Sequence, residues 1–139
     1  RILKLWRIFI PSQASMITLS VLTLFAIDDK PHILLHRHKK YRTLMQPGGH
    51  VELHENPWQA ILHEIPEETG YDVSQLMIFQ PIAPKFLETT NTAVLPLPFL
   101  INTHCVRDGT VDDHYHDDDV YVFLADGIPK NKPAQEHLG

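Results

Sequence analysis

Three glutamates lie close together in the middle of the sequence, at Glu64, Glu67 and Glu68. On a helix, which turns by about 100° per residue, this spacing places all three on one face. Carboxylates crowded in this way repel one another near neutral pH unless a cation or a proton compensates. Carboxylate oxygens favour a hard cation, and Mg²⁺ commonly binds through one or two of them while phosphate oxygens complete its shell. We therefore expect Mg²⁺ or Mn²⁺ here; the alternative is a solvated acidic face.

The residues around these glutamates carry the signals of a helix. Asn56 can act as N-cap, Pro57 suits the first helical position, and Gln59 completes a capping-box pattern. Gly70 can adopt the left-handed conformation that ends a helix. The apolar residues between these signals recur at helical spacing and predict a stripe facing a core, made of Trp58, Ile61, Leu62 and Ile65.

This segment resembles the signature of Nudix hydrolases, G-x5-E-x7-R-E-U-x-E-E-x-G-U, in which U is a bulky apolar residue. The fixed positions of the signature are matched by Gly49, Glu55, Glu64, Ile65, Glu67, Glu68 and Gly70. The stretch Pro47-Gly48-Gly49-His50-Val51-Glu52 is similar to the usual lead-in. The resemblance implies an α/β/α sandwich with a mixed β-sheet and a loop-helix-loop catalytic motif.

The resemblance also implies an activity, the hydrolysis of the phosphoanhydride in a nucleoside diphosphate linked to another moiety. Nucleoside triphosphates, nucleotide sugars and dinucleoside polyphosphates all remain open as substrates. By the same resemblance, Glu64, Glu67 and Glu68 would hold the divalent ions, with the backbone carbonyl of Gly48 as a further ligand. Glu64 is the first candidate to activate the attacking water instead.

The chain departs from the family pattern at His63, which replaces an arginine. In the family this arginine helps to hold the loop glutamate, here Glu55, in register with the catalytic helix. Histidine is only partly charged near neutral pH and lacks the two-pronged guanidinium group. We therefore expect a slower enzyme whose rate depends on pH in the histidine range.

Pro66 is the second departure, because proline inside a helix removes one backbone hydrogen bond and disfavours helical geometry at the preceding residue. A kink there would move Glu67 and Glu68 relative to Glu64. We expect the site to survive, since its acidic positions and both glycines remain. A non-catalytic Nudix module that binds nucleotide as a sensor is the alternative suggested by these departures. An isomerase of isoprenoid diphosphates ranks last, because Cys105 stands in no supporting motif.

Aspartates and histidines form an unusual run later in the chain. On an extended strand His114, His116 and Asp118 would share one side, which could hold a transition metal. Many Nudix enzymes draw an additional acidic ligand or base from a later loop, and Asp118 and Asp119 are the candidates, with Glu88 as a weaker one. The alternative is a solvated acidic turn.

Residues before and after the glycine turn are candidates for substrate binding. Arg37 and Arg42 belong to a basic cluster that could steer an anionic substrate, although a solvent-facing hairpin tip would look the same. Gly49 would let the backbone approach phosphate without a Cβ in the way. His50 and Glu52 stand at the mouth of the motif, where a substrate contact and a structural role are both open.

The whole chain has 139 residues with 43% hydrophobic content, which suits one core and one domain over 1–139. A formal charge of −5 argues against nucleic-acid binding through a basic face. The single Cys105 fits a reducing interior, so we expect a cytoplasmic protein, and no apolar run is long enough to span a membrane. Residues 1–15 predict a short amphipathic helix and linker that pack on this domain or on a partner, which makes a homodimer our expectation.

Strands are expected on both sides of the helix. Pro96 and Pro98 predict that the first half of the segment expected over 93–105 is irregular. The expected strands cover residues 16–27, 32–38, the surroundings of Leu44, 75–81, 93–105 and 119–125.

Overall fold

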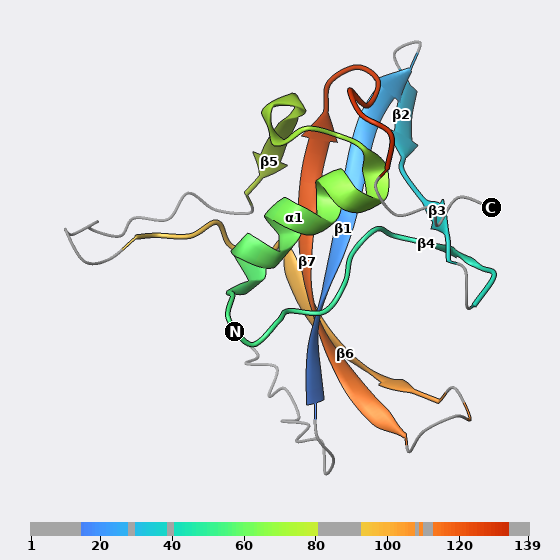
Figure 1. Cartoon of the computed structure of the whole chain (residues 1–139), viewed down its shortest axis with the longest axis vertical. Coiled ribbons are helices and arrows are strands. Elements are labelled where there is room, and N and C mark those ends of the chain that lie inside the picture. The colour runs from blue at the N-terminus through green and yellow to red at the C-terminus, as the bar shows by residue number, and fades with distance from the viewer. Residues whose placement is uncertain are drawn as a thin grey trace, which may run out of the picture.

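The protein is described by a computed structural model that covers residues 15–27, 30–38, 41–80, 93–107, 109 and 113–133, with the backbone alone in 15–27. One α-helix lies across a five-stranded sheet in this part of the chain (Figure 1). The elements are β1 (Ser15–Ile27), β2 (Lys30–Ile33), β3 (His36–Arg37), β4 (Leu44–Met45), α1 (Pro57–Thr69), the 3₁₀ turn η1 (Val73–Gln75), β5 (Leu76–Phe79), β6 (Leu100–Val106) and β7 (His114–Ala125).

The sheet is built around β7. Along one edge β7 pairs in parallel with β1, from Ser15 opposite Tyr115 to Leu24 opposite Leu124. Along its other edge, β6 and then β5 pair with it in antiparallel direction. The strand β2 continues the sheet beyond β1, and β3 and β4 form a separate hairpin. This mixed sheet, with the helix between its strands in sequence, agrees with the fold implied by the resemblance.

The core lies between α1 and β7, and the predicted apolar stripe forms it. Ile61 and Ile65 are fully buried against the side chains of Tyr121 and Phe123. The ring of Trp58 stacks on Phe123 with 6.1 Å between ring centroids. Burial raises the pKa of Tyr121 to about 12. One face of the helix is therefore committed to packing, which leaves its remaining surface for the glutamates.

The ends of α1 are those that the sequence predicts. The side chain of Asn56 accepts a hydrogen bond from the Gln59 N–H, and the Gln59 side chain accepts one from the Asn56 N–H. Gly70 ends the helix in the left-handed conformation with φ of 76°. A Cβ at this position would also lie 2.1 Å from the carbonyl oxygen of Asn131, which passes directly beside it. Glycine is thus required here for two separate reasons.

Several strand boundaries differ from the sequence expectation. The segment expected over 32–38 divides into β2 and β3, and β6 begins only at Leu100, after the irregular stretch that the prolines predict. The strand expected from Asp119 begins at His114 instead. Aspartate is a poor strand former, but pairing with β1 and β6 on both edges overrides this preference. The helix expected in 1–15 lies outside the described residues, apart from Ser15, which begins β1.

In the described ranges no helix is long and apolar enough to cross a membrane.

Pro66 lies within α1, and the helix continues beyond it to Thr69, with the Gly70 N–H donating to the Pro66 carbonyl at 3.0 Å. The carbonyl of Leu62 cannot receive the usual helical bond from a residue without an N–H. Glu64, Glu67 and Glu68 therefore stay on one continuous helix, although the missing backbone bond lowers the stability of that helix.

Replacing Pro66 with alanine should stabilise the fold, by up to about 3 kcal/mol, because the missing helical bond can then form. The free energy of unfolding in urea measures the effect. Pro57→Ala is the matched control, since proline at the first helical position lacks no bond, and it should change stability by less than about 1 kcal/mol. Equal effects of the two substitutions would contradict this account of Pro66.

Candidate functional site

The glycine turn before α1 lies against the acidic face of the helix. The Gly48 N–H donates to Glu68 Oε2 at 2.8 Å, joining residues that are 20 positions apart. A Cβ on Gly49 would lie 2.1 Å from Glu64 Oε1, so the Glu64 carboxylate occupies the space that any side chain at position 49 would need. The backbone of the turn thus meets two of the three predicted ligands directly.

His63 lies between the carboxylates of Glu55 and Glu64. Its Nδ1 is 3.2 Å from Glu55 Oε2, and its Nε2 is 3.7 Å from Glu64 Oε1. Glu55 in turn accepts a hydrogen bond from the Glu52 N–H at 3.0 Å, and this bond joins two residues of the loop that precedes α1. The histidine therefore makes the contact with the loop glutamate that the resemblance assigns to an arginine, but with one nitrogen in place of a fork.

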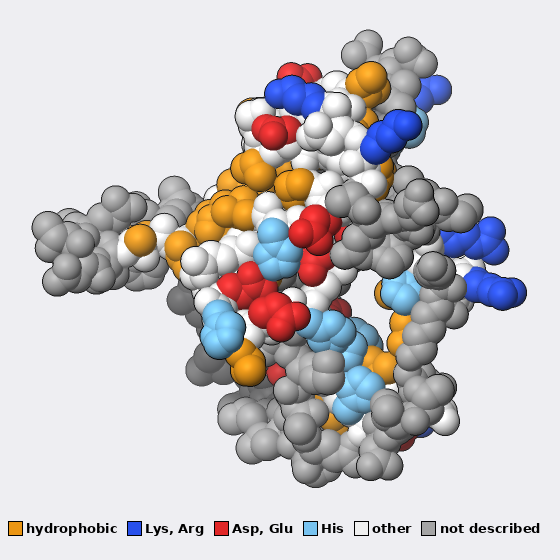
Figure 2. Space-filling model, viewed as in Figure 1, with side chains coloured by type: hydrophobic (Ala, Val, Ile, Leu, Met, Phe, Trp, Pro, Cys, Tyr) orange, Lys and Arg blue, Asp and Glu red, His pale blue; other side chains and the backbone are white. Residues whose placement is uncertain are grey.

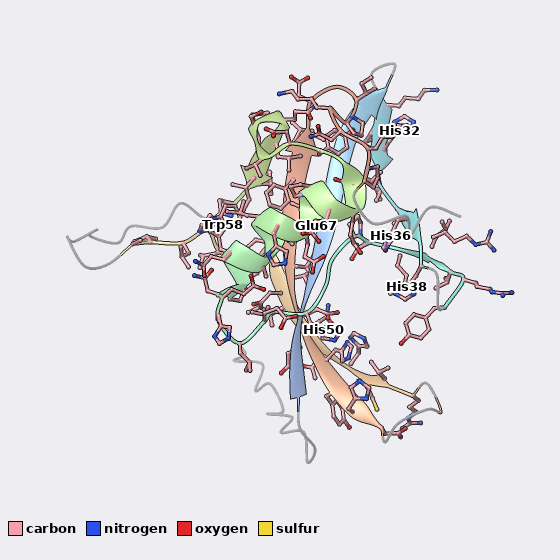
Figure 3. The ribbon with its side chains drawn as sticks, viewed as in Figure 1. His32, His36, His38, His50, Trp58 and Glu67 are labelled. Atoms are coloured by element: carbon pink, nitrogen blue, oxygen red, sulfur yellow. The ribbon has the colours of Figure 1, made fainter. Side chains whose placement is uncertain are left out.

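His36 is a site neighbour that sequence reasoning missed. It is 8% exposed, and its Nδ1 is 4.0 Å from Oε2 of Glu68, which is 9% exposed. The Nδ1 atom is buried and has no hydrogen-bond partner among the residues that the structure describes. Figure 3 shows His36, the first residue of β3, to one side of the helix that carries Glu67. The only signal in the sequence was a histidine at the start of the basic cluster, and nothing local connects it to Glu68.

The electrostatics of the site centre on Glu64. Burial raises the pKa of this carboxyl, and the neighbouring charges of Glu68, Glu67 and Glu55 raise it further, against a lowering contribution from His63. Asp and Glu side chains gather near the middle of this face of the molecule, whereas Lys and Arg lie toward its rim (Figure 2). A cation placed among these carboxylates would relieve their repulsion.

The donor set suits a hard divalent ion, since every candidate atom is an oxygen. Within the described residues, however, no three His, Cys, Asp or Glu side chains are placed to hold a metal ion as they stand. Glu68 is turned toward the Gly48 N–H, and Glu64 is turned toward Gly49 and His63. Binding of an ion by both would require their carboxylates to rotate from these contacts.

The other residues predicted for the site belong to the β3–β4 hairpin, to the segment after the glycine turn and to β7. Arg37 and Arg42 belong to the β3–β4 hairpin, and both are exposed. His50 follows the glycine turn, and its ring lies 5.5 Å from that of His116 on β7.

The acidic residues of the later run lie on β7, and Glu88 lies outside the described residues. Asp118 Oδ2 is 3.3 Å from His104 Nδ1. Burial raises the pKa of Asp119, followed by the charges of Asp117 and Asp118. A role for Asp118 and Asp119 as further ligands of the ion stays a prediction.

Comparison with known proteins bears on the family. A family model described as the NUDIX domain matches residues 16–136. A solved NUDIX-family hydrolase from Clostridium perfringens is 27% identical, with a TM-score of 0.61 over 85% of this chain and 73% of that one.

More distant solved structures share the fold. An Ap4A hydrolase of C. elegans is 15% identical, with a TM-score of 0.59 over 86% of this chain and 75% of its own. The dihydroneopterin triphosphate pyrophosphohydrolase of E. coli is 14% identical, with a TM-score of 0.58 over 84% and 74%. At these identities the likeness concerns the fold alone. No curated protein sequence matches the chain significantly.

The raised pKa of Glu64 has a consequence for stability. Its pKa lies above the ordinary 4.5, so losing the proton costs the folded state more than the unfolded state. This cost is absent below about pH 4 and fully present above the raised pKa. In a chelator at pH 8, Glu64→Gln should therefore stabilise the fold by roughly 0.5 to 1 kcal/mol, the sum of two helical like-charge pairs. Thermal unfolding should show this gain shrinking toward pH 4, and a variant less stable than the parent at pH 8 would contradict it.

Replacing His63 with arginine should restore a charged fork on Glu55 and make the enzyme faster. Stronger positioning worth about 1 kcal/mol corresponds to roughly fivefold in rate, and the dependence on pH between about 5 and 8 should flatten. Steady-state rates across this range measure both effects. His54→Arg adds the same charge at an exposed position nearby and is the control. An unchanged rate and pH profile in His63→Arg would rule out this role.

Proposed function

Because the chain belongs to the Nudix hydrolase family, we propose that it hydrolyses the phosphoanhydride of a nucleoside diphosphate linked to another moiety. The observation that carries this proposal is the contact of the glycine turn with the helical carboxylates. The Gly48 N–H binds Glu68, and Gly49 leaves its side-chain space to Glu64. This contact places the backbone of the turn, including the carbonyl proposed as a ligand, beside the carboxylates that would hold the ion.

The divalent ions that Nudix hydrolases generally use would be Mg²⁺ or Mn²⁺ in this protein. We assign Glu64, Glu67 and Glu68 as their ligands, with the carbonyl of Gly48. An ion bound there would neutralise the phosphate oxygens and assist the attack of water on phosphorus. This assignment is supported by the all-oxygen donor set and by the like-charge repulsion that, after burial, raises the pKa of Glu64.

As an alternative to its role as a ligand, Glu64 is our first candidate to accept the proton of the attacking water, in which case Glu67, Glu68 and the carbonyl of Gly48 would hold the ions. A general base works best when its pKa lies near the working pH, and the burial and charges around Glu64 move its pKa in that direction. His63 lies 3.7 Å from the same carboxylate and would position it while holding Glu55. The retained contact between His63 and Glu55 favours a working enzyme over a nucleotide sensor, which is the alternative.

The leaving group is not selected by the residues of this site. The distant fold relatives include one named for Ap4A and one for dihydroneopterin triphosphate, so the fold accommodates different substrates. Arg37, Arg42, His50 and Glu52 remain our candidates for contacts to the substrate. We also propose a cytoplasmic homodimer, on the grounds of the single Cys105 and the apolar residues at the start of the chain.

A panel of nucleoside triphosphates, nucleotide sugars and dinucleoside polyphosphates, assayed with Mg²⁺ and with Mn²⁺ for released monophosphate or phosphate, tests the proposal. At least one class should be hydrolysed. Glu68→Gln should reduce that rate by roughly 10²-fold or more, because the substitution removes a charged ligand. Asp126→Asn, an exposed carboxylate beyond β7, is the matched control and should leave the rate unchanged.

The results separate the function classes. Nucleotide binding without turnover in every class would favour the sensor. Full activity in Glu68→Gln would contradict the assignment of the site, even if the chain is a hydrolase.

A further inference from the structure

Four histidines from three parts of the chain gather next to the glycine turn. His50 follows the turn, His104 lies on β6, and His114 and His116 lie on β7. The ring of His116 is central, with centroid distances of 5.0 Å to His114, 5.5 Å to His50 and 5.6 Å to His104. We call these four residues the histidine group. Figure 2 shows histidine side chains clustered next to the acidic patch.

The strand register explains why these side chains meet. His104 lies directly opposite His116 in the antiparallel β6–β7 pair. His114 is two residues from His116 and therefore projects from the same face of β7. Two histidines on alternate positions of one strand, with a third opposite one of them on the neighbouring strand, present three imidazoles to one region of space. This backbone arrangement does not depend on the rotation of any side chain.

The separations in the group are close to those of a shared zinc ion. Zinc binds imidazole nitrogen at about 2.0–2.1 Å with tetrahedral angles, which places two bound nitrogens roughly 3.3 Å apart and their ring centroids roughly 5 Å apart. The Nε2 atoms of His114 and His116 are 3.0 Å apart. The described side chains do not yet converge on one point, so ring rotations on this fixed backbone must bring the third nitrogen in.

The surroundings also suit an imidazole-bound ion. His104 Nδ1 lies 3.3 Å from Asp118 Oδ2, and a carboxylate that holds one ring nitrogen leaves the other directed at the metal, as metal-binding histidines commonly require. The pKa of His116 is lowered by burial first, then by His50, His114 and His104. A neutral imidazole is the form that binds metal ions.

We propose that His104, His114 and His116 bind a divalent ion of the zinc class, with His50 as the fourth ligand in place of a substrate contact and Asp118 orienting His104 in place of binding magnesium. The site is chemically distinct from the glutamates of α1, Glu64, Glu67 and Glu68, because imidazole selects zinc and related transition metals whereas carboxylates alone select magnesium. His50 directly follows Gly49, so the bound ion would fasten the glycine turn to the β6–β7 pair.

A titration of the metal-free protein with Zn²⁺, in excess Mg²⁺ to occupy the carboxylates, tests this proposal. One Zn²⁺ per chain should bind, and Co²⁺ in its place should give the intense visible absorption of a tetrahedral nitrogen site. His116→Gln should weaken Zn²⁺ binding at least about tenfold. His104→Gln, at an exposed position on β6, should do the same and serves if His116→Gln fails to fold, as judged by circular dichroism.

Two controls make the outcome decisive. His32→Gln, on β2 and outside the group, should bind Zn²⁺ as the parent does. Glu68→Gln should also retain Zn²⁺, which separates this site from the proposed hydrolysis. The proposal is overturned if the parent chain binds no Zn²⁺, if His116→Gln and His104→Gln both bind it unchanged, if Glu68→Gln loses it, or if bound Co²⁺ shows only octahedral absorption.

Discussion

The contact between the backbone of two glycines and the carboxylates of Glu64 and Glu68 is the constraint on which the site depends. A carboxylate beside a backbone N–H forms a charge-assisted hydrogen bond, which is stronger than a neutral one. The Gly48 N–H provides such a bond to Glu68, while Gly49 allows Glu64 to lie directly against the turn. The turn thus holds Glu68 by this bond and lies directly against Glu64, and both carboxylates would rotate from it to bind one ion. Everything else in the site is arranged around this pair.

The helix α1 serves the core and the site at the same time. Ile61 and Ile65 anchor one face on β7, and this packing sets the height and rotation of the carboxylates on another face. The site also carries destabilising features, namely a proline inside the helix and a largely buried carboxyl whose pKa is raised by burial and by its neighbours. Strain and repulsion of this kind are common where a site binds a charged ligand.

The parts of the structure that the sequence predicts are those with local causes. The caps at Asn56 and Gly70, the apolar stripe and the irregular stretch before β6 follow from neighbouring residues. The early start of β7 and the pairing of His104 with His116 do not, because both depend on which strands meet and in which register. The contact of His36 with Glu68 joins residues whose spacing carries no periodic signal. Sequence reasoning therefore placed the glutamates on the helix correctly but did not identify their neighbours in space.

The close approach at Gly49 has a consequence for the evolution of this chain. A side chain at position 49 and the carboxylate at position 64 would compete for the same space, because a Cβ on residue 49 would lie 2.1 Å from Oε1 of Glu64. A descendant that exchanged Glu64 for a shorter residue would be free to acquire alanine or serine at 49, whereas one that kept the carboxylate could do so only by turning Glu64 away from the turn. The residue types at positions 49 and 64 should thus covary among descendants. Glycine at position 49 is then expected in descendants that keep the carboxylate of residue 64.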